Sequence, residues 1–376
     1  MNFKLENLRK DEQIPLMLGQ LYQQFGYAKF KMEKFEEYDF YAQNKNFLKS
    51  HKIITFPDSE GKLVALKPDI TLSIIKNTKA SKTHADKRFY NENVYRVSKY
   101  TGEFCEITQT GLEYLGNVTV YTMTEILGLA MRSLELIHKN YVLSIADVNF
   151  LTELISDCTD DEKTAKAILK AFNEKNPDFI TSLSQKGEIS EPNAKRLKKL
   201  MASYGDLCSC LKVMEELSFN EVTNKAVSQF EKIAQAFKDT KYADKIKLDF
   251  SIVEDTKYYN GLVFQGFVSK VPHYVLSGGR YDKLLKMMNK NELDAIGFAV
   301  YLDDLGRYIK KEEELKVDTM LLYDDKSDIK TLNKVIDEHL DMGKTFFVEE
   351  RIPENMKFSK ILKIENDKIT EVKGND

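Results

Sequence analysis

The stretch FCEITQTGLEYLG, residues 104–116, reads as one long β-strand and decides the fold. Alternate residues of a strand share a face, so Gln109, Gly111 and Glu113 point the same way. A glycine inside a strand often marks the close approach of a ligand or another backbone. The pattern predicts a notch at Gly111 between an amide and a carboxylate, suited to the floor of a small polar site.

A second strand precedes this one and completes a hairpin. The segment RFYNENVYRV, residues 88–97, is joined to the first strand by the polar loop 98–103. Arg96 on this strand can point to the same face and offer a fixed cation for a ligand carboxylate. Taken alone, the hairpin also fits a solvent-exposed face with an incidental glycine, and both interpretations stay open at this point.

Before the hairpin, helix and turn signals alternate. Apolar residues at helical spacing predict a helix over residues 11–27 that ends at Gly26. Residues 51–69 read as two short strands around the turn 58–61, followed by a helix after Pro68.

After the hairpin, a helix near 119–139 and a strand near 141–148 lead into an almost wholly helical stretch, interpreted as an insertion over about 150–244. Strands return at 245–254, 258–268 and 273–279, and two helices are expected to begin near Tyr281 and Ala295. The charged segment 310–316 reads as a solvated linker. The expected domains are therefore 1–310 and a short α/β unit over 311–376, with strands at 319–323, 346–350 and 361–366 around a helix at 332–340.

Bulk composition narrows the functional classes. A length of 376 residues exceeds one ordinary core, and 42% hydrophobic with 31% charged residues is near the globular average. No run reaches the roughly 18 apolar residues of a membrane helix, and the charged start lacks a signal-peptide core, so a cytoplasmic protein is expected. Four cysteines and five histidines show no disulfide or metal-ligand spacing. The formal charge of -3 offers no broad basic surface for RNA.

One ordered series of residues extends across most of the chain. Its most specific parts are QTGLE at 109–113, YYNGLVFQ at 258–265 and SGGRYD at 277–282. The series resembles the class II core of histidyl-tRNA synthetase over about residues 10–308, with the helical stretch at the place of that enzyme's insertion. The other members of the series are Phe56, Asp58, Gly61, the segment Leu66-Lys67-Pro68-Asp69, Thr71 and Arg96.

The resemblance implies an α+β fold: an antiparallel sheet core with helices, a helical insertion and a small C-terminal α/β unit. It also implies a histidine site, in which Asp69, Thr71 and Gln109 hold the α-amino group and Glu113, Tyr259 and Tyr281 surround the imidazole. A buried site of paired polar groups rejects ligands that lack the matching groups. The remaining residues of the expected histidine-binding set are Arg96, Tyr258 and Gly279.

Residues that handle ATP in the resembled enzyme are replaced here. The loop 97–103 lacks the expected arginine and glutamate, and only Lys99 could substitute. Glu254 and Asp304 stand where arginines are expected, and Tyr301 stands where a glycine leaves space. A unit charge at 4 Å contributes roughly 4 kcal/mol at an effective dielectric of 20, so two reversals beside a polyanion predict loss of ATP affinity.

The C-terminal tail supports the same interpretation. From Val317 onward it holds 14 acidic and 10 basic residues and is shorter than the anticodon-binding domain of true synthetases. An acidic surface repels tRNA phosphates, so tRNA binding is not expected.

A kept amino-acid site, a lost ATP site and a short tail together resemble the ATP phosphoribosyltransferase regulatory subunit family. The resemblance implies a protein with no catalytic residues, cofactor or metal, a partner in the short-form catalytic subunit, L-histidine as feedback effector and a homodimeric building block. It would serve the first step of histidine biosynthesis. Two alternatives stay open: a divergent histidyl-tRNA synthetase, and a binding module that no longer senses histidine.

Overall fold

The computed structural model describes residues 8, 10–45, 48, 53–97, 102–308, 316–342, 344–353, 356–365 and 368–372. Two compact units are described separately: Ile14–Tyr308, and a unit that contains Ile309–Asp376.

A nine-stranded sheet forms the larger unit, and its four central strands are antiparallel neighbours. The predicted hairpin is confirmed, with Asp86 opposite Leu115 and Val97 opposite Phe104. In spatial order the strands are β1 (Ala28–Lys29), β5 (Asp86–Val97), β6 (Phe104–Gly116), β12 (Asp294–Tyr301), β11 (Leu276–Arg280), β10 (Leu262–Val268), β7 (Tyr141–Asp147), β9 (Ile246–Leu248) and β8 (Gly205–Asp206).

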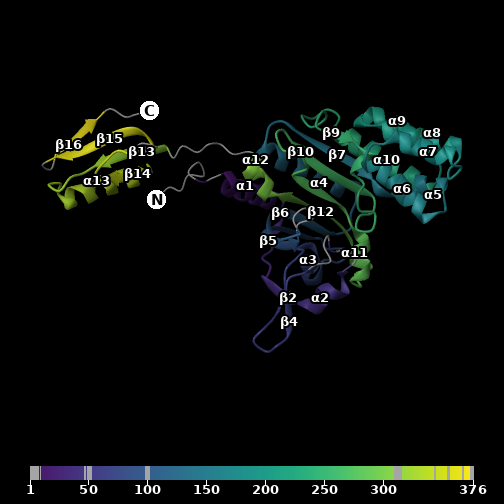
Figure 1. Ribbon diagram of the computed structural model, residues 1–376, viewed down its shortest axis with the longest axis horizontal. Helices are drawn as coiled ribbons and strands as arrows, with labels where there is room; N and C mark the ends of the chain where they lie inside the picture. The colour runs from purple at the N-terminus through teal and green to yellow at the C-terminus, as the bar shows by residue number, and fades with distance from the viewer. Residues whose placement is uncertain are drawn as a thin grey trace. The chain divides into compact units, whose positions relative to one another are not determined.

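Two helices supply aromatic and aliphatic packing for the sheet. α1 (Lys10–Gln24) buries Tyr22, whose ring makes edge contacts with Phe89 at 6.1 Å and Phe298 at 5.9 Å between centroids. α4 (Val120–Ile137) packs against β7, β10 and β12, and the Tyr22 hydroxyl lies 3.0 Å from Ser133 Oγ on that helix. Figure 1 shows α4 lying across β7 and β10. These apolar contacts fix the sheet on which the site is built.

A small three-stranded sheet, β2 (Phe35–Glu37), β4 (Leu63–Leu66) and β3 (Thr55–Pro57), precedes the hairpin, with α2 (Tyr38–Gln43) beside it. The predicted turn at 58–61 is confirmed: Asp58 Oδ1 accepts hydrogen bonds from two following backbone N–H groups, and Gly61 has φ +83°. α3 (Thr71–Asn77) follows, so the helix predicted after Pro68 is also confirmed. It packs on β6 and brings Thr71 to the sheet.

Six helices occupy the stretch expected to be helical, and Figure 1 shows them gathered beyond β7 and β9. Each begins at an Asp, Asn or Ser whose side chain accepts a backbone N–H of the first turn, the usual N-cap arrangement. They are α5 (Val148–Cys158), α6 (Glu162–Asn173), α7 (Pro177–Gln185), α8 (Glu191–Ala202), α9 (Leu207–Leu217) and α10 (Glu221–Phe237).

The helix expected near Ala295 is wrong. Residues 294–301 form strand β12, which pairs with β6 on one side and β11 on the other, and the helix α12 (Leu302–Tyr308) begins only afterwards. A central strand is buried on both faces and reads as a continuous apolar run, which periodicity does not distinguish from a buried helix. The helix expected near Tyr281 is confirmed as α11 (Asp282–Met287).

The smaller unit has a four-stranded sheet in the order β14-β13-β15-β16, with one helix, α13 (Ile329–Asp341), in the described residues. Val335 of α13 is buried together with Leu321, Leu362 and Ile364 of the sheet. The four elements predicted in this tail are confirmed, but β16 was not predicted. The strands are β13 (Lys316–Leu322), β14 (Phe346–Glu349), β15 (Lys357–Glu365) and β16 (Lys368–Val372). Among helices in the described ranges, none has the length and apolar character needed to cross a bilayer.

Candidate functional site

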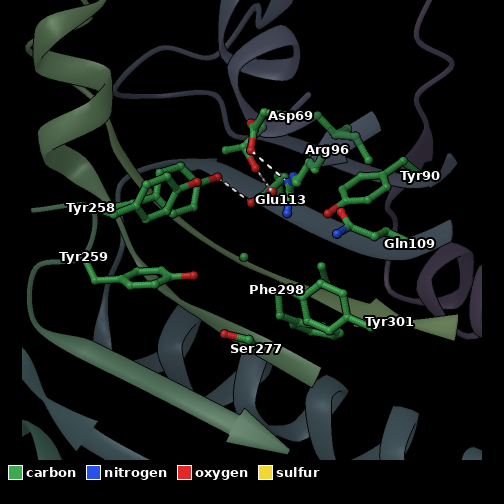
Figure 2. Close-up of a pocket in the computed structure, with 15 residues that line it drawn as sticks. Asp69, Tyr90, Arg96, Gln109, Glu113, Tyr258, Tyr259, Ser277, Phe298 and Tyr301 are labelled. Carbon is green, nitrogen blue, oxygen red and sulfur yellow. Dashed lines mark hydrogen bonds and ion pairs between the residues drawn. The ribbon is translucent and has the colours of Figure 1, made fainter. Parts of the chain in front are cut away.

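One face of the central sheet carries a small cavity that gathers most of the predicted site residues (Figure 2). Cross-strand pairing places Glu113 opposite Gly297, and Gln109 opposite Tyr301. The volume is about 40 Å³, far below the roughly 300–1,000 Å³ of typical ligand sites. The cavity in this structure is therefore small and closely lined by side chains. The lining residues are Asp69, Ile70, Thr71, Tyr90, Arg96, Gln109, Glu113, Tyr258, Tyr259, Ser277, Tyr281, Gly297, Phe298, Ala299 and Tyr301.

Glu113 is the chemical centre of this cavity, and its side chain is 3% exposed. Thr71 Oγ1 donates a hydrogen bond to Oε1 at 2.8 Å, and the Tyr281 hydroxyl donates to Oε2 at 2.5 Å. Burial raises the pKa of Glu113 to about 8, although these two hydrogen bonds oppose the increase. At neutral pH the carboxyl group is therefore mainly protonated and can share its proton with a basic ligand atom.

Four tyrosines surround this carboxyl group: Tyr90, Tyr258, Tyr259 and Tyr281. Burial raises the pKa of each of them well above its ordinary value, so their hydroxyls remain neutral hydrogen-bond groups. The Tyr258 ring meets Tyr259 edge-on at 4.7 Å and lies 5.8 Å from Tyr281 between centroids. Such a wall suits a flat, polar ring better than a flexible chain.

An opposite-charge pair lines another side of the cavity. Arg96 Nη2 lies 3.6 Å from Asp69 Oδ2, and Arg96 Nε donates to the Pro68 carbonyl at 2.8 Å. The Leu72 backbone N–H donates to Asp69 Oδ1 at 3.0 Å, which fixes the carboxylate at the start of α3. A zwitterion could divide this pair, its amino group meeting Asp69 and its carboxylate meeting Arg96.

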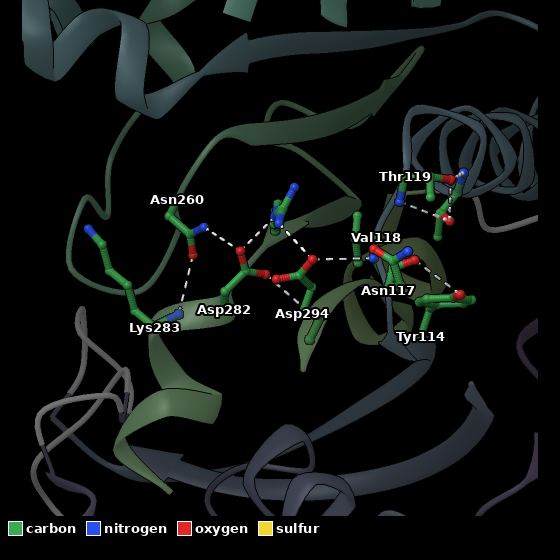
Figure 3. A network of polar contacts seen from close by, with 11 residues as sticks. Tyr114, Asn117, Val118, Thr119, Asn260, Asp282, Lys283 and Asp294 are labelled. Atoms are coloured by element: carbon green, nitrogen blue, oxygen red, sulfur yellow. Dashed lines mark hydrogen bonds and ion pairs between the residues drawn. The ribbon is translucent and has the colours of Figure 1, made fainter. Parts of the chain in front are cut away.

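Asp282, the residue after Tyr281 in the chain, lies in a polar network with Asn260 and Arg280 (Figure 3). Asp282 Oδ2 accepts from Arg280 Nε at 2.7 Å and from Asn260 Nδ2 at 2.9 Å, while Oδ1 accepts from the Ala295 backbone N–H at 3.0 Å. Arg280 also pairs with Asp294 at 2.9 Å. Because these residues join β11, α11 and β12, the SGGRYD motif positions Tyr281 through its neighbours.

Of the nine residues predicted for histidine binding, eight line the cavity. The exception is Gly279: a Cβ there would lie 2.8 Å from Tyr259 Cδ1, so this glycine makes room for the tyrosine ring. Sequence reasoning missed several lining residues, although strand register could have indicated some of them, since Tyr90 faces Gly111 across the hairpin. The lining residues outside the predicted histidine-binding set are Ile70, Tyr90, Ser277, Gly297, Phe298, Ala299 and Tyr301, the last of which was expected at the lost ATP site.

The notch predicted at Gly111 does not receive a ligand. A Cβ at this position would lie 2.5 Å from the Tyr90 hydroxyl oxygen and would also clash with the Phe298 carbonyl oxygen. Tyr90 therefore fills the space that the glycine leaves. The glycine serves close packing of three strands, because Tyr90, Gly111 and Phe298 belong to β5, β6 and β12.

A second cavity of about 280 Å³ adjoins the first and shares Tyr258, Tyr259 and Ser277 with it. Glu254 and Asp255 line it, and the described lining includes no Lys or Arg. An anion such as a triphosphate would meet two carboxylates here. Lys99 and the loop residues 98–101 lie outside the described residues, as does the side chain of Asp304.

In the residues that the structure describes, the cysteines form no disulfide and the possible metal ligands form no cluster. Cys105, Cys158, Cys208 and Cys210 are free cysteines. Within the described ranges, no group of three or more His, Cys, Asp and Glu side chains could hold a metal ion.

The sequence of this chain is similar to those of known proteins. A family profile described as histidyl-tRNA synthetase matches residues 3–305. The chain is 27% identical, over 84% of its length and 76% of the relative's, to an ATP phosphoribosyltransferase regulatory subunit of Clostridium botulinum (strain 657 / Type Ba4).

Solved structures share the fold. One is described as an ATP phosphoribosyltransferase regulatory subunit/histidyl-tRNA synthetase from Bacillus halodurans; it has a TM-score of 0.74 and 21% identity, covering 93% of this chain and 91% of that one. Another is described as the ATP phosphoribosyl transferase (HisG:HisZ) complex from Thermotoga maritima. It has a TM-score of 0.62 and 16% identity, and the match covers 78% of this chain and 97% of that chain. The expected α+β fold with a class II synthetase-like sheet is confirmed, and the chain belongs to the histidyl-tRNA synthetase family.

Proposed function

We propose that this protein is the non-catalytic regulatory subunit of an ATP phosphoribosyltransferase and binds L-histidine as a feedback effector in the cavity around Glu113. The names of its curated relatives support the first part. The partner would be the short-form catalytic subunit, since a related solved structure is described as a complex of two kinds of chain. A homodimer of the class II unit would be the building block of this assembly.

The observation that carries the proposal is that the cavity around Glu113 adjoins a second cavity lined by two carboxylates. Glu113, Tyr259 and Tyr281 offer a proton-sharing carboxyl group and neutral hydroxyls to an imidazole. Directly beside them, where ATP would need cations, Glu254 and Asp255 line the second cavity. A protein that binds histidine but not ATP could sense the amino acid but could not adenylate it, so this arrangement supports the regulatory role.

A divergent histidyl-tRNA synthetase is the second candidate, favoured by the description of the matching family. Purified protein incubated with ATP, L-histidine and tRNA is expected to form no histidyl-tRNA, whereas a short-form catalytic subunit expressed beside it should co-purify with it. Measurable aminoacylation would establish the synthetase alternative. Absence of co-purification would contradict the regulatory role.

The affinity for L-histidine should depend on pH in a way set by Glu113. Below about pH 8 the free carboxyl group keeps its proton, and the imidazole of free histidine has a pKa near 6.5. If the Glu113 carboxyl group and the imidazole share one proton in the complex, binding between about pH 6.5 and pH 8 neither takes up nor releases a proton. Below about pH 6.5, binding must release one proton, so affinity should fall roughly fivefold from pH 6.5 to 5.5 and roughly ninefold from pH 7.3 to 5.5.

Calorimetric titration at pH 7.3 and 5.5, in buffers of different ionisation enthalpy, measures both the affinity and the released proton. An ordinary glutamate, with a pKa near 4.3, would pair best with the charged imidazolium. In that case, affinity would hold or rise at pH 5.5, and the proton-sharing account would be wrong.

A further inference from the structure

A third cavity, of about 440 Å³, lies in the larger unit, and its volume falls within the roughly 300–1,000 Å³ of typical ligand sites. One wall is a single face of helix α10, and the other comes from the ends of β7 and β11 and the residues beside them. Among the residues that the structure describes, none lines both this cavity and either of the other two. The third cavity is therefore separate from the proposed histidine site.

Asp147 places a buried carboxylate in this third cavity. The residue ends β7 and is 2% exposed, and as the N-cap of α5 its Oδ1 accepts the Phe150 backbone N–H at 2.8 Å. Its Oδ2 lies on the side of Gly261, because a Cβ on that glycine would be 3.8 Å from it. Gly261 lines the same cavity and has φ +82°, a conformation that favours glycine. The carboxylate thus faces the cavity across a residue without a side chain.

The Asp147 carboxylate lacks a counter-ion. In the described part of the chain, no Lys, Arg or His side-chain nitrogen lies within 4.0 Å of it. Arg280 is the cation that acts on it from farther away, but this guanidinium is bound by Asp282 at 2.7 Å and by Asp294 at 2.9 Å (Figure 3). One arginine therefore serves three carboxylates, and a buried charge without a close partner is costly.

The electrostatic cost is visible in the pKa of Asp147. Burial raises this pKa to about 6, although the backbone N–H groups of Phe150 and Asn149 and the charge of Arg280 oppose the increase. At pH 7 the group is still mainly ionised. A cation in the cavity would stabilise it, whereas a carboxylate or phosphate would add to the excess of negative charge.

The α10 wall does not supply the missing cation. Glu221 and Lys225 lie one turn apart on the face that lines the cavity, and both are exposed at its edge. Their opposite charges largely cancel at the distance of Asp147. Farther along the same face, the amide of Gln229 can hydrogen-bond to the rest of a bound molecule.

We propose that the third cavity binds a small molecule through a primary ammonium group, which pairs with the Asp147 carboxylate. The ligand class is a small amine with hydrogen-bonding groups, and the ammonium group supplies the positive charge that Arg280 shares among three carboxylates. This inference does not depend on histidine binding in the first cavity.

Ligand-observed NMR titration of the full chain tests the site with a matched pair of probes, L-alaninamide and L-lactamide. They differ only in an ammonium group and a hydroxyl group at the same carbon. L-alaninamide should bind about tenfold or more tightly, since a hydrogen bond to a charged partner is among the stronger ones. L-alanine, as a third probe, distinguishes a free amino acid from an amine without a carboxylate as the source of the ammonium group.

Asp147→Asn removes the charge and keeps the helix cap, because Asn and Asp are about equally good N-cap residues. It should lower the affinity for L-alaninamide about tenfold and leave that for L-lactamide within twofold of wild type. Asp157→Asn is the matched control on the same helix, because Asp157 does not line the cavity. It should bind all three probes like wild type.

Equal affinity of wild-type protein for L-alaninamide and L-lactamide, or no binding of either, would overturn the ammonium site, and this comparison holds even if Asp147→Asn does not fold. Binding of L-alaninamide that is unchanged in Asp147→Asn would also overturn it, because the amine would then occupy another place, such as the first cavity beside Asp69. Loss of L-histidine binding alone would overturn the proposed function and leave this site intact.

Discussion

Glu113→Gln is expected to weaken L-histidine binding by about 30- to 150-fold, because it removes the buried group that shares a proton with the imidazole. The side chain is 3% exposed and already accepts hydrogen bonds from Thr71 and Tyr281. An amide cannot exchange its protons with a ring nitrogen, and losing a hydrogen bond to a charged group in a buried site costs about 2–3 kcal/mol. Calorimetric titration measures the loss directly.

Assembly with the catalytic subunit should survive this substitution. Glu106→Gln is a matched control on the same strand, since Glu106 is exposed and lies outside the cavity. It should bind L-histidine like wild type. Unchanged histidine binding by Glu113→Gln would show that the ligand site lies elsewhere.

The same variant has a pH-dependent effect on stability without any ligand. The pKa of Glu113 is raised to about 8 in the folded protein by burial, so between its unfolded value and 8 the folded state binds more protons. Wild-type stability should therefore fall as pH rises through this window, by at most about 1.4 kcal/mol per pH unit relative to Glu113→Gln. Denaturant unfolding at pH 5.5 and 7.5 tests the sign.

Gly297→Ala is expected to damage both the fold and the site. A Cβ at this position would clash with Glu113 Oε2 and with the Leu112 carbonyl oxygen, and neither the backbone nor the hydrogen-bonded carboxyl group can move freely. Overpacking of this kind costs about 2–4 kcal/mol, or roughly 5–10 °C in Tm for a unit of this size. Histidine binding should be lost as well, because Glu113 is displaced.

Gly128→Ala serves as the matched control for that variant. Gly128 lies inside helix α4, and the nearest atom to its added Cβ is Arg132 Nη1 at 3.0 Å, the end of a flexible side chain. Alanine favours a helix by about 1 kcal/mol over glycine, so Tm should hold or rise. Equal Tm values for the two variants, measured by scanning calorimetry, would contradict the close packing described at Gly297.

Alternation along the hairpin predicted much of the site. Because side chains alternate along a strand, Gln109 and Glu113 were placed on one face from sequence alone, and Arg96 joined them through pairing. Thr71 and Asp69, which lie at the start of the helix after Pro68, were placed in the site by the resemblance. The resemblance, and not periodicity, supplied Tyr259 and Tyr281, which come from distant segments.

The sequence-based predictions were wrong at two places where tertiary packing decides the local structure. The apolar run after Asp294 carries no period that separates a central strand from a helix, and pairing with β6 and β11 makes it a strand. Gly111 was interpreted as ligand space, but the Tyr90 hydroxyl occupies it. The small volume of the cavity depends on several side chains from distant segments that meet there, which no local pattern encodes.

Activity of the reconstituted complex, titrated with L-histidine, tests the central claim most directly. The catalytic subunit paired with wild-type chain should be inhibited by L-histidine, whereas the same subunit paired with Glu113→Gln should assemble and turn over but need roughly 30- to 150-fold more histidine for half-inhibition. Identical inhibition of the two complexes would contradict the claim that this cavity senses histidine.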